Sequence, residues 1–220
     1  MQIDVISIFP NLIEDVLGYS IIKRARDKNL VNINVHNLRD YTTNKHKKVD
    51  DYPYGGGSGM VMQIEPFVNC IESLKVKVSY DEIILLSADG LRLNQNISNQ
   101  LSLKKNIMLL CGHYKGVDER LVQNFITKEV SIGDYVLTGG ELPAAVLIDS
   151  VVRLLPGVLS DEESALKDSF QCGLLHEPIY TRPANFRGLK VPEILLSGNE
   201  KKINEWRLEE AVKRTKLKKR

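Results

Sequence analysis

The chain has 220 residues, of which 43% are hydrophobic and 26% charged, and its formal net charge is +2. These values are typical of a folded protein and exclude a largely disordered chain. No apolar run approaches the roughly 20 residues of a membrane-spanning helix, and the N-terminus does not resemble a signal peptide, so we expect a cytoplasmic protein.

In chain order, the hydrophobic pattern predicts strands that alternate with helices. We expect a strand over 3–9, a helix over 11–29, a strand over 32–38, a polar loop over 39–63 and a helix over 65–75. Three apolar runs of strand length follow, separated by helical patterns, at 82–88, 106–111 and 129–137, before an apolar helix over 141–155. This alternation predicts an α/β domain with a mostly parallel sheet.

The pattern changes beyond residue 159. Residues 160–171 are polar and acidic and are the best candidate for a linker, which separates a domain of residues 1–159 from a small domain of residues 172–220. The small domain starts with a proline-rich extended stretch and ends in a helix from about residue 198. From residue 199 onward nine Lys or Arg face four Glu, a net charge of +5. This excess fits a polyanionic partner, or simply a solvated helix end whose cations complement the helix dipole.

Metal and disulfide signals are weak. The three cysteines, Cys70, Cys111 and Cys172, are far apart and form no CxxC pair. The four histidines have no metal-ligand spacing either. We therefore predict no disulfide framework and no zinc site.

A glycine-rich loop is the first candidate for chemistry. Residues 49–60 read VDDYPYGGGSGM, with four glycines in five positions. The segment matches neither the P-loop nor the Rossmann fingerprint. A mobile surface loop explains the glycines alone, but the neighbouring lysines and carboxylates favour a ligand-binding loop.

Two further loops follow predicted strands and precede predicted helices. The first is CGHYKGVDER over 111–120, and the second is SIGDYVLTGGE over 131–141. Each has glycines at its tight points, which an ordinary strand-to-helix connection would also explain. Because ligands bind at the carboxyl ends of strands in open α/β sheets, the two loops together with residues 85–90 predict a small-molecule site.

These segments, in this order, resemble the bacterial tRNA (guanine-N1)-methyltransferase family, TrmD. The resemblance covers nearly the whole chain, in segments 36–40, 49–60, 111–120, 131–142, 153–159, 168–170, 180–183 and 191–199. It implies a SPOUT-type fold with a deep trefoil knot, S-adenosylmethionine as methyl donor, and a homodimer with its active sites at the subunit interface. It also implies that magnesium supports the reaction, without a protein site that we can name, and that the substrate is the guanine immediately 3′ of the anticodon in tRNA.

The resemblance assigns residues 1–159 to a knotted domain that binds the cofactor and residues 172–220 to tRNA binding. The cofactor would contact main-chain groups of three strand ends. The residues that we expect there are Leu86, Ser87, Gly112, Tyr114, Ile132, Gly133, Asp134, Tyr135, Val136, Leu137, Gly139 and Gly140. His46, Asp50 and Gly59 match the loop that helps to hold the target guanines in this family, and Arg24 suits contact with tRNA phosphates.

The chemistry requires removal of the proton on guanine N1. Asp168 is the predicted general base, and Arg153 is predicted to stabilise the negative charge that builds on the guanine oxygen. From the residues alone, Asp168 would be a turn-capping carboxylate in a linker and Arg153 a cation at a helix end; the resemblance reverses this preference.

The chain departs from the family pattern at two places. His113 and Lys115 stand where the pattern has Arg and Glu, and Ala88 and Asp89 stand where it has Pro and Gln. The change at position 115 puts in doubt any metal or cofactor contact carried over from that position.

Two other functions remain open. A non-catalytic RNA-binding protein would use the basic tail and the glycine loop as a phosphate clamp, but it would not need glycine-bracketed strand ends. A nucleotide-dependent enzyme on an ordinary doubly wound sheet would also fit the alternation, although both phosphate fingerprints are absent.

Overall fold

The computed structural model describes residues 1–159 and 173–218. The chain divides into two compact units, residues 1–160 and 161–220. Within the described ranges, no helix has both the length and the apolar character needed to cross a membrane.

The first unit is built on a five-stranded parallel sheet in the order β2-β1-β6-β5-β7. The strands are β1 (Gln2–Ser7), β2 (Asn32–Asn37), β5 (Glu82–Arg92), β6 (Asn106–Cys111) and β7 (Lys128–Ser131). All five therefore end at the same edge of the sheet, and the expected α/β class with a mostly parallel sheet is confirmed.

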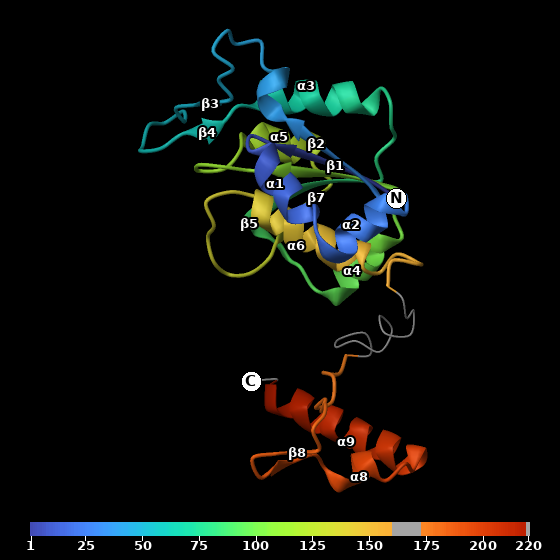
Figure 1. Cartoon of the computed structure of the whole chain (residues 1–220). Helices are drawn as coiled ribbons and strands as arrows, with labels where there is room; N and C mark the ends of the chain where they lie inside the picture. Colours follow the sequence, from blue (N-terminus) through green and yellow to red (C-terminus); the bar gives the residue numbers. More distant parts are fainter. Residues whose placement is uncertain (160–172, 219–220) are drawn as a thin grey trace. The chain divides into compact units, whose positions relative to one another are not determined.

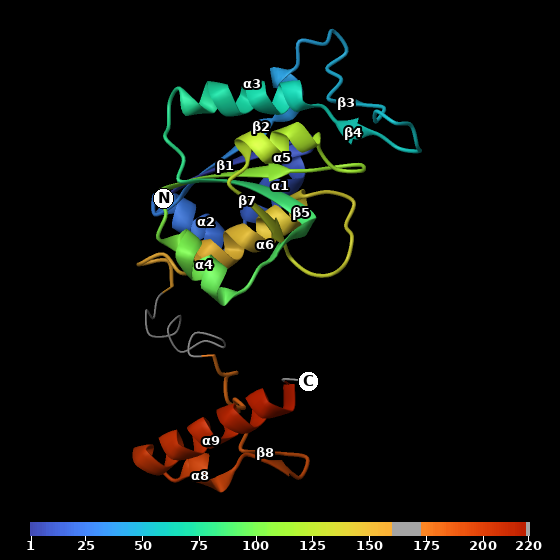
Figure 2. The ribbon, with the colours of Figure 1, turned by 180° about the vertical axis from the view of Figure 1, so that it is seen from behind.

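Helices cover both faces of this sheet (Figure 1). One face carries α1 (Pro10–Leu17), α2 (Ser20–Asp27), α4 (Gln95–Ser102) and α6 (Glu141–Val152), and the other carries α3 (Ile64–Lys75) and α5 (Glu119–Phe125). Seen from behind in Figure 2, the same two helical layers enclose the sheet. Alternate residues of β6 point to the two faces, Ile107 and Leu109 to one core and Met108 and Leu110 to the other, because side chains alternate along a strand.

The expected helix over 11–29 is wrong as one element. Two helices, α1 and α2, occupy this stretch, and Gly18 ends the first of them. Ser20 has a φ of 56°, which an unbroken α-helix does not accommodate. The chain therefore turns between the two helices, and both pack on the sheet.

The long loop predicted over 39–63 contains structure that the pattern did not indicate. A short 3-10 helix, η1, covers Leu38–Tyr41, and β3 (Asp50–Asp51) pairs antiparallel with β4 (Val61–Met62). The glycine-rich segment is the tip of this hairpin, which projects from the domain in Figure 1. We call residues 50–62 the glycine hairpin.

The strand predicted over 129–137 ends at Ser131, and residues 132–137 form a loop. Val136 and Leu137 made this stretch look like a buried strand, but their side chains are 86% and 41% exposed. The strand predicted over 82–88 continues to Arg92, and the helix predicted to reach residue 155 ends at Val152.

The described part of the second unit starts at residue 173. It contains the hairpin of β8 (Asn185–Phe186) and β9 (Leu189–Lys190), followed by α8 (Glu193–Leu196) and the long helix α9 (Glu200–Lys218). Two hydrogen bonds fasten the start of the unit to α9: Leu175 N–H donates to Thr215 Oγ1 at 2.8 Å, and Arg214 Nη1 donates to the carbonyl of His176 at 3.0 Å. The predicted linker 160–171 lies outside the described residues.

Candidate active site

A cavity of about 520 Å³ lies at the carboxyl edge of the parallel sheet. It is lined by the end of β5, the loop after β6 and the loop between β7 and α6. Its volume falls within the usual range of about 300–1,000 Å³ for small-molecule sites. The three strand ends that the sequence singled out thus meet at one pocket.

The loops after β6 and β7 approach each other closely at two glycines. Gly140 N–H donates to the carbonyl of Gly112 at 2.9 Å, and a β-bridge joins Gly139 to His113. A methyl group on Gly140 would lie 2.7 Å from Cα of Cys111, and one on Gly139 would collide with the His113 ring. Glycine at both positions therefore allows the two loops to form one wall of the pocket.

A buried polar network supports this wall from behind. Glu141, the first residue of α6, is 2% exposed and accepts a hydrogen bond from Ser7 Oγ at 2.5 Å. Its other carboxylate oxygen lies 2.6 Å from His113 Nε2. Burial and the nearby Glu141 raise the pKa of the Cys111 thiol well above its ordinary value. The network links β1, the loop after β6 and the start of α6.

The glycine hairpin is joined to the pocket loop by main-chain hydrogen bonds. Lys115 N–H donates to the carbonyl of Met60 at 3.1 Å, and Met62 N–H donates to the carbonyl of Gly116 at 3.0 Å. At the base of the hairpin, hydrogen bonds from the Tyr52 amide and Lys48 lower the pKa of Asp51. These contacts place the hairpin beside residues 114–116, which line the cavity.

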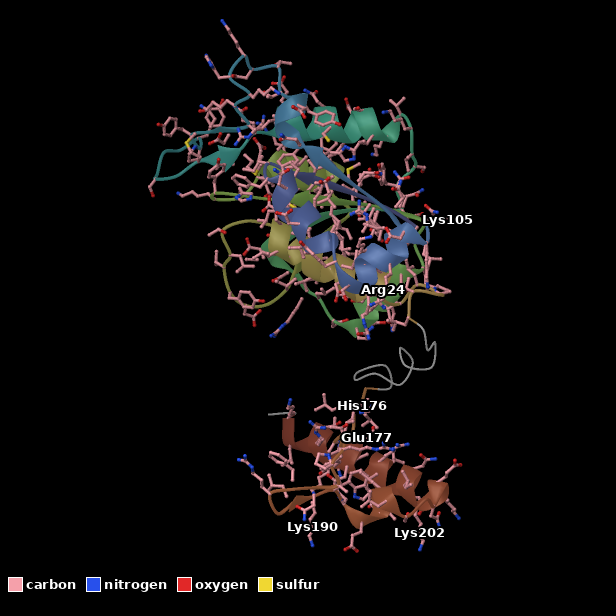
Figure 3. All side chains as sticks on the ribbon, viewed as in Figure 1. Arg24, Lys105, His176, Glu177, Lys190 and Lys202 are labelled. Carbon is pink, nitrogen blue, oxygen red and sulfur yellow. The ribbon has the colours of Figure 1, made fainter. Side chains whose placement is uncertain are left out.

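Eleven of the twelve residues predicted to bind the cofactor line the cavity. The exception is Asp134, whose exposed carboxylate lies 3.3 Å from Arg92. The remaining predicted positions are more scattered. His46, Asp50 and Gly59 lie in or beside the glycine hairpin, whereas Arg24 lies on α2, away from the pocket loops (Figure 3).

Arg153, one of the two predicted catalytic residues, is not among the residues that line the cavity. Asp168 lies outside the described residues. Arg153 follows the last turn of α6, whereas the pocket is at the first turn, so about 18 Å of helix separates them. Figure 1 shows α6 running from the loop of residues 132–140 to the opposite end of the domain.

Sequence reasoning missed some pocket residues. Glu129, in β7, lines the cavity although it lies outside the three predicted loops. Asp89, Val117, Glu119 and Thr138 lie within those loops and also line the cavity, but they were not among the named contacts. The support from Ser7 and Glu141 was missed as well, because these residues are 134 positions apart and no local pattern relates them. The one available signal was Glu141 itself, an acidic residue at the start of a largely apolar helix.

Comparison with known proteins identifies similar chains. The family model described as tRNA (Guanine-1)-methyltransferase TrmD matches residues 1–220. A protein of Bacteroides thetaiotaomicron named tRNA (guanine-N(1)-)-methyltransferase is 57% identical over 98% of this chain and 96% of its own length. Proteins of the same name from Flavobacterium johnsoniae and Cytophaga hutchinsonii are 59% and 57% identical over 98% of this chain, covering 96% and 92% of their own lengths.

Proposed function

The chain belongs to the tRNA (guanine-1)-methyltransferase family, and from this membership we propose that it methylates N1 of a guanine in tRNA with S-adenosylmethionine as donor. The target is the guanine immediately 3′ of the anticodon, as the family resemblance implies. The observation that carries the proposal is the cavity formed by three strand ends in a chain so similar to these enzymes. Because the substrate is tRNA, we also propose a cytoplasmic location.

The residues of the cavity fit an adenosyl ligand. The wall formed by 112–116 and 132–140 exposes main-chain groups, and Gly112, Gly139 and Gly140 add no side chain that would fill the space. Backbone N–H and C=O groups would recognise the edge of an adenine, and the apolar residues Leu86 and Ile132, which line the cavity, would hold its ring. When bound, S-adenosylmethionine supplies an activated methyl group on its sulfonium.

Asp168 is the proposed general base. An aspartate has an ordinary pKa of about 3.9, so it is a weak base at neutral pH and depends on accurate placement beside N1–H. Arg153 remains charged at all relevant pH values and stabilises the negative charge on the guanine oxygen as the proton leaves. N1 would then take the methyl group directly as the carbon–sulfur bond of the sulfonium breaks and leaves a neutral thioether, without a covalent enzyme intermediate.

We propose that the active site combines two subunits of a homodimer. The position of Arg153, one helix length from the cavity of its own chain, supports this arrangement. A second support is an apolar surface on α1 and α6, where four side chains are 45–49% exposed: Leu12, Val16, Leu142 and Val146. Exposed apolar surface of this kind marks protein interfaces.

The remaining parts of the proposal concern the fold and the RNA. The knot is supported by the close packing of residues 139–140 against 111–113, which brings distant segments into main-chain contact.

The basic residues of α9 suit tRNA phosphates, so we assign residues 172–220 to tRNA binding, after a linker at 160–171. Arg24, His46, Asp50 and Gly59 remain proposed substrate contacts.

We assign no protein site for magnesium in the described residues. Across residues 1–159 and 173–218, no three His, Cys, Asp or Glu side chains are grouped to hold a metal. Lys115 also places a cation in the pocket where the family pattern has an acidic residue. No step proposed here therefore passes through a metal.

The activity is tested with purified protein, labelled S-adenosylmethionine and two tRNA transcripts. One transcript carries guanine at the position 3′ of the anticodon, preceded by a second guanine, and the other carries adenine at the target position. We expect label at N1 of guanine in the first transcript only. Cofactor-independent tRNA binding without transfer would instead support the non-catalytic RNA-binding protein.

Asp168→Asn tests the assignment of the base. The variant keeps the shape of the side chain but cannot accept the proton, so we expect transfer to fall by a factor of about 10²–10⁴. Calorimetric titration should give an unchanged Kd for the cofactor. Turnover within a few-fold of the wild type would show that another group removes the proton.

A further inference from the structure

Lys115 connects the two proposed ligand-binding elements of the first unit. Its main chain belongs to the loop after β6, and its amide N–H bonds to Met60 of the glycine hairpin. The residue also lines the cavity. The residue thus lies where the proposed cofactor pocket meets the proposed substrate loop.

The glycines of the hairpin make room for this lysine. A methyl group on Gly59 would lie 3.2–3.3 Å from Cγ, Cδ and Cε of Lys115, and one on Gly57 would lie 3.5 Å from its Nζ. The stem therefore runs along the glycine backbone, and the ammonium reaches Gly57. A lysine buries its carbon stem in this way while its charge stays in water.

The ammonium of Lys115 has no carboxylate partner within residues 1–159 and 173–218. Two other lysines next to the hairpin do have carboxylate partners. Nζ of Lys47 lies 2.9 Å from Oδ1 of Asp40, and Nζ of Lys48 lies 3.3 Å from Oδ1 of Asp51. An unpaired cation on a residue that lines a pocket is suited to an oxyanion of the ligand.

We propose that Lys115 binds a backbone phosphate next to the target guanine and so positions the RNA against the pocket. This inference rests on the proposed function, because it assumes an RNA substrate. A lysine binds phosphate as a compact point charge and needs no fixed geometry, which suits an exposed ammonium on a flexible stem. The other oxyanion source is the carboxylate of the cofactor, and the experiment distinguishes the two.

The experiment compares Lys115→Gln and Lys115→Arg in the full-length protein. Gln keeps most of the stem and removes the charge, whereas Arg retains the charge. Lys105→Gln is the control, because Lys105 is an exposed lysine that precedes β6, at the edge of the sheet opposite the pocket (Figure 3). The measurements are the Kd of tRNA over a series of salt concentrations and the Kd of S-adenosylmethionine by calorimetry.

One lost phosphate contact should reduce the slope of log affinity against log salt by about 0.7–0.9. We expect Lys115→Gln to show this change together with a roughly tenfold weaker tRNA Kd, the effect of one charge-assisted hydrogen bond. Lys115→Arg should restore both values, and the cofactor Kd should stay within twofold. Lys105→Gln should leave the tRNA Kd unchanged.

Two results would overturn the inference. An unchanged salt slope in Lys115→Gln would mean that the ammonium contacts no phosphate. A cofactor Kd weakened tenfold, with an unchanged salt slope, would assign the ammonium to the cofactor carboxylate. Failure of the proposed function is distinguishable, because the wild-type protein would then bind tRNA without transferring a methyl group.

Discussion

Gly140 lines the pocket and Gly55 lies at the tip of the glycine hairpin, and glycine is required at the two positions for different reasons. Gly140 has an ordinary φ of −82°, yet a methyl group there would lie 2.7 Å from Cα of Cys111. Gly55, at the tip of the glycine hairpin, has nothing within 4 Å of such a methyl group, but its φ is +82°. At position 140 the backbone of Cys111 leaves no room for a side chain. At position 55 there is room, but the positive φ disfavours any residue other than glycine.

This difference separates a packed part of the site from an open one. The wall at residues 139–141 is fixed by contacts with β1 and with the loop after β6. The hairpin tip is held through its base, at Met60 and Met62, and its remaining surface faces solvent. We infer that the wall shapes the pocket for a small ligand, while the tip is available for a large one such as RNA.

Gly140→Ala should lower the free energy of unfolding more than any other substitution considered for these two regions. The new methyl group meets backbone rather than a flexible side chain, so the two loops must separate, at a cost of about 3 kcal/mol in the free energy of unfolding. Urea denaturation measures this loss. Calorimetry should show cofactor binding at least tenfold weaker, since the displaced loops form the pocket wall. A variant with wild-type stability and affinity would mean that the loops are not in close contact in solution.

Glu141→Gln should have an intermediate effect. The buried carboxylate accepts from Ser7 and pairs with His113, and an amide replaces one accepting oxygen with a donor. The change removes the charge from a buried hydrogen-bonded carboxylate, and hydrogen bonds to charged groups are the stronger ones, so we expect a loss of about 2 kcal/mol in the free energy of unfolding.

Asp27→Asn is the matched control for Glu141→Gln. It also removes one carboxylate charge, from a pair with Lys23 in which the two side chains are 57% and 60% exposed. An exposed pair of this kind contributes at most about 0.5 kcal/mol. Urea denaturation measures the free energy of unfolding of both variants. If both lost the same amount, the distinction between a packed wall and an ordinary surface would be contradicted.

The sequence predicted the parts of the fold that depend on local patterns. The strand over Asn106–Cys111 was predicted with its observed bounds, because a buried apolar run there lies between a lysine and a glycine. The break at Gly18 was missed, since the apolar positions of α1 and α2 continue in helical spacing across it. Residues 132–137 were taken for a strand because apolar side chains that line a pocket cannot be told from core residues by pattern alone.

The location of the pocket was predictable for a general reason. Parallel strands place their carboxyl ends at one edge, so loops that follow β5, β6 and β7 had to meet. The network of Ser7, His113 and Glu141 was not predictable, because it depends on contacts between three segments that are distant in the sequence. The chemical identity of the ligand came from the family resemblance alone.

Gly55→Ala should have the smallest effect. Because the site is open, the only cost is the positive φ, about 1 kcal/mol, and a hairpin tip that rearranges in solvent relieves part of it. Gly55→Asn should cost less, since asparagine tolerates the left-handed region better than alanine does. Both variants should keep the wild-type Kd for the cofactor by calorimetry. If Gly55→Ala instead weakened cofactor binding as much as Gly140→Ala, the tip would be part of the pocket wall, and a single steric requirement would then govern both glycines.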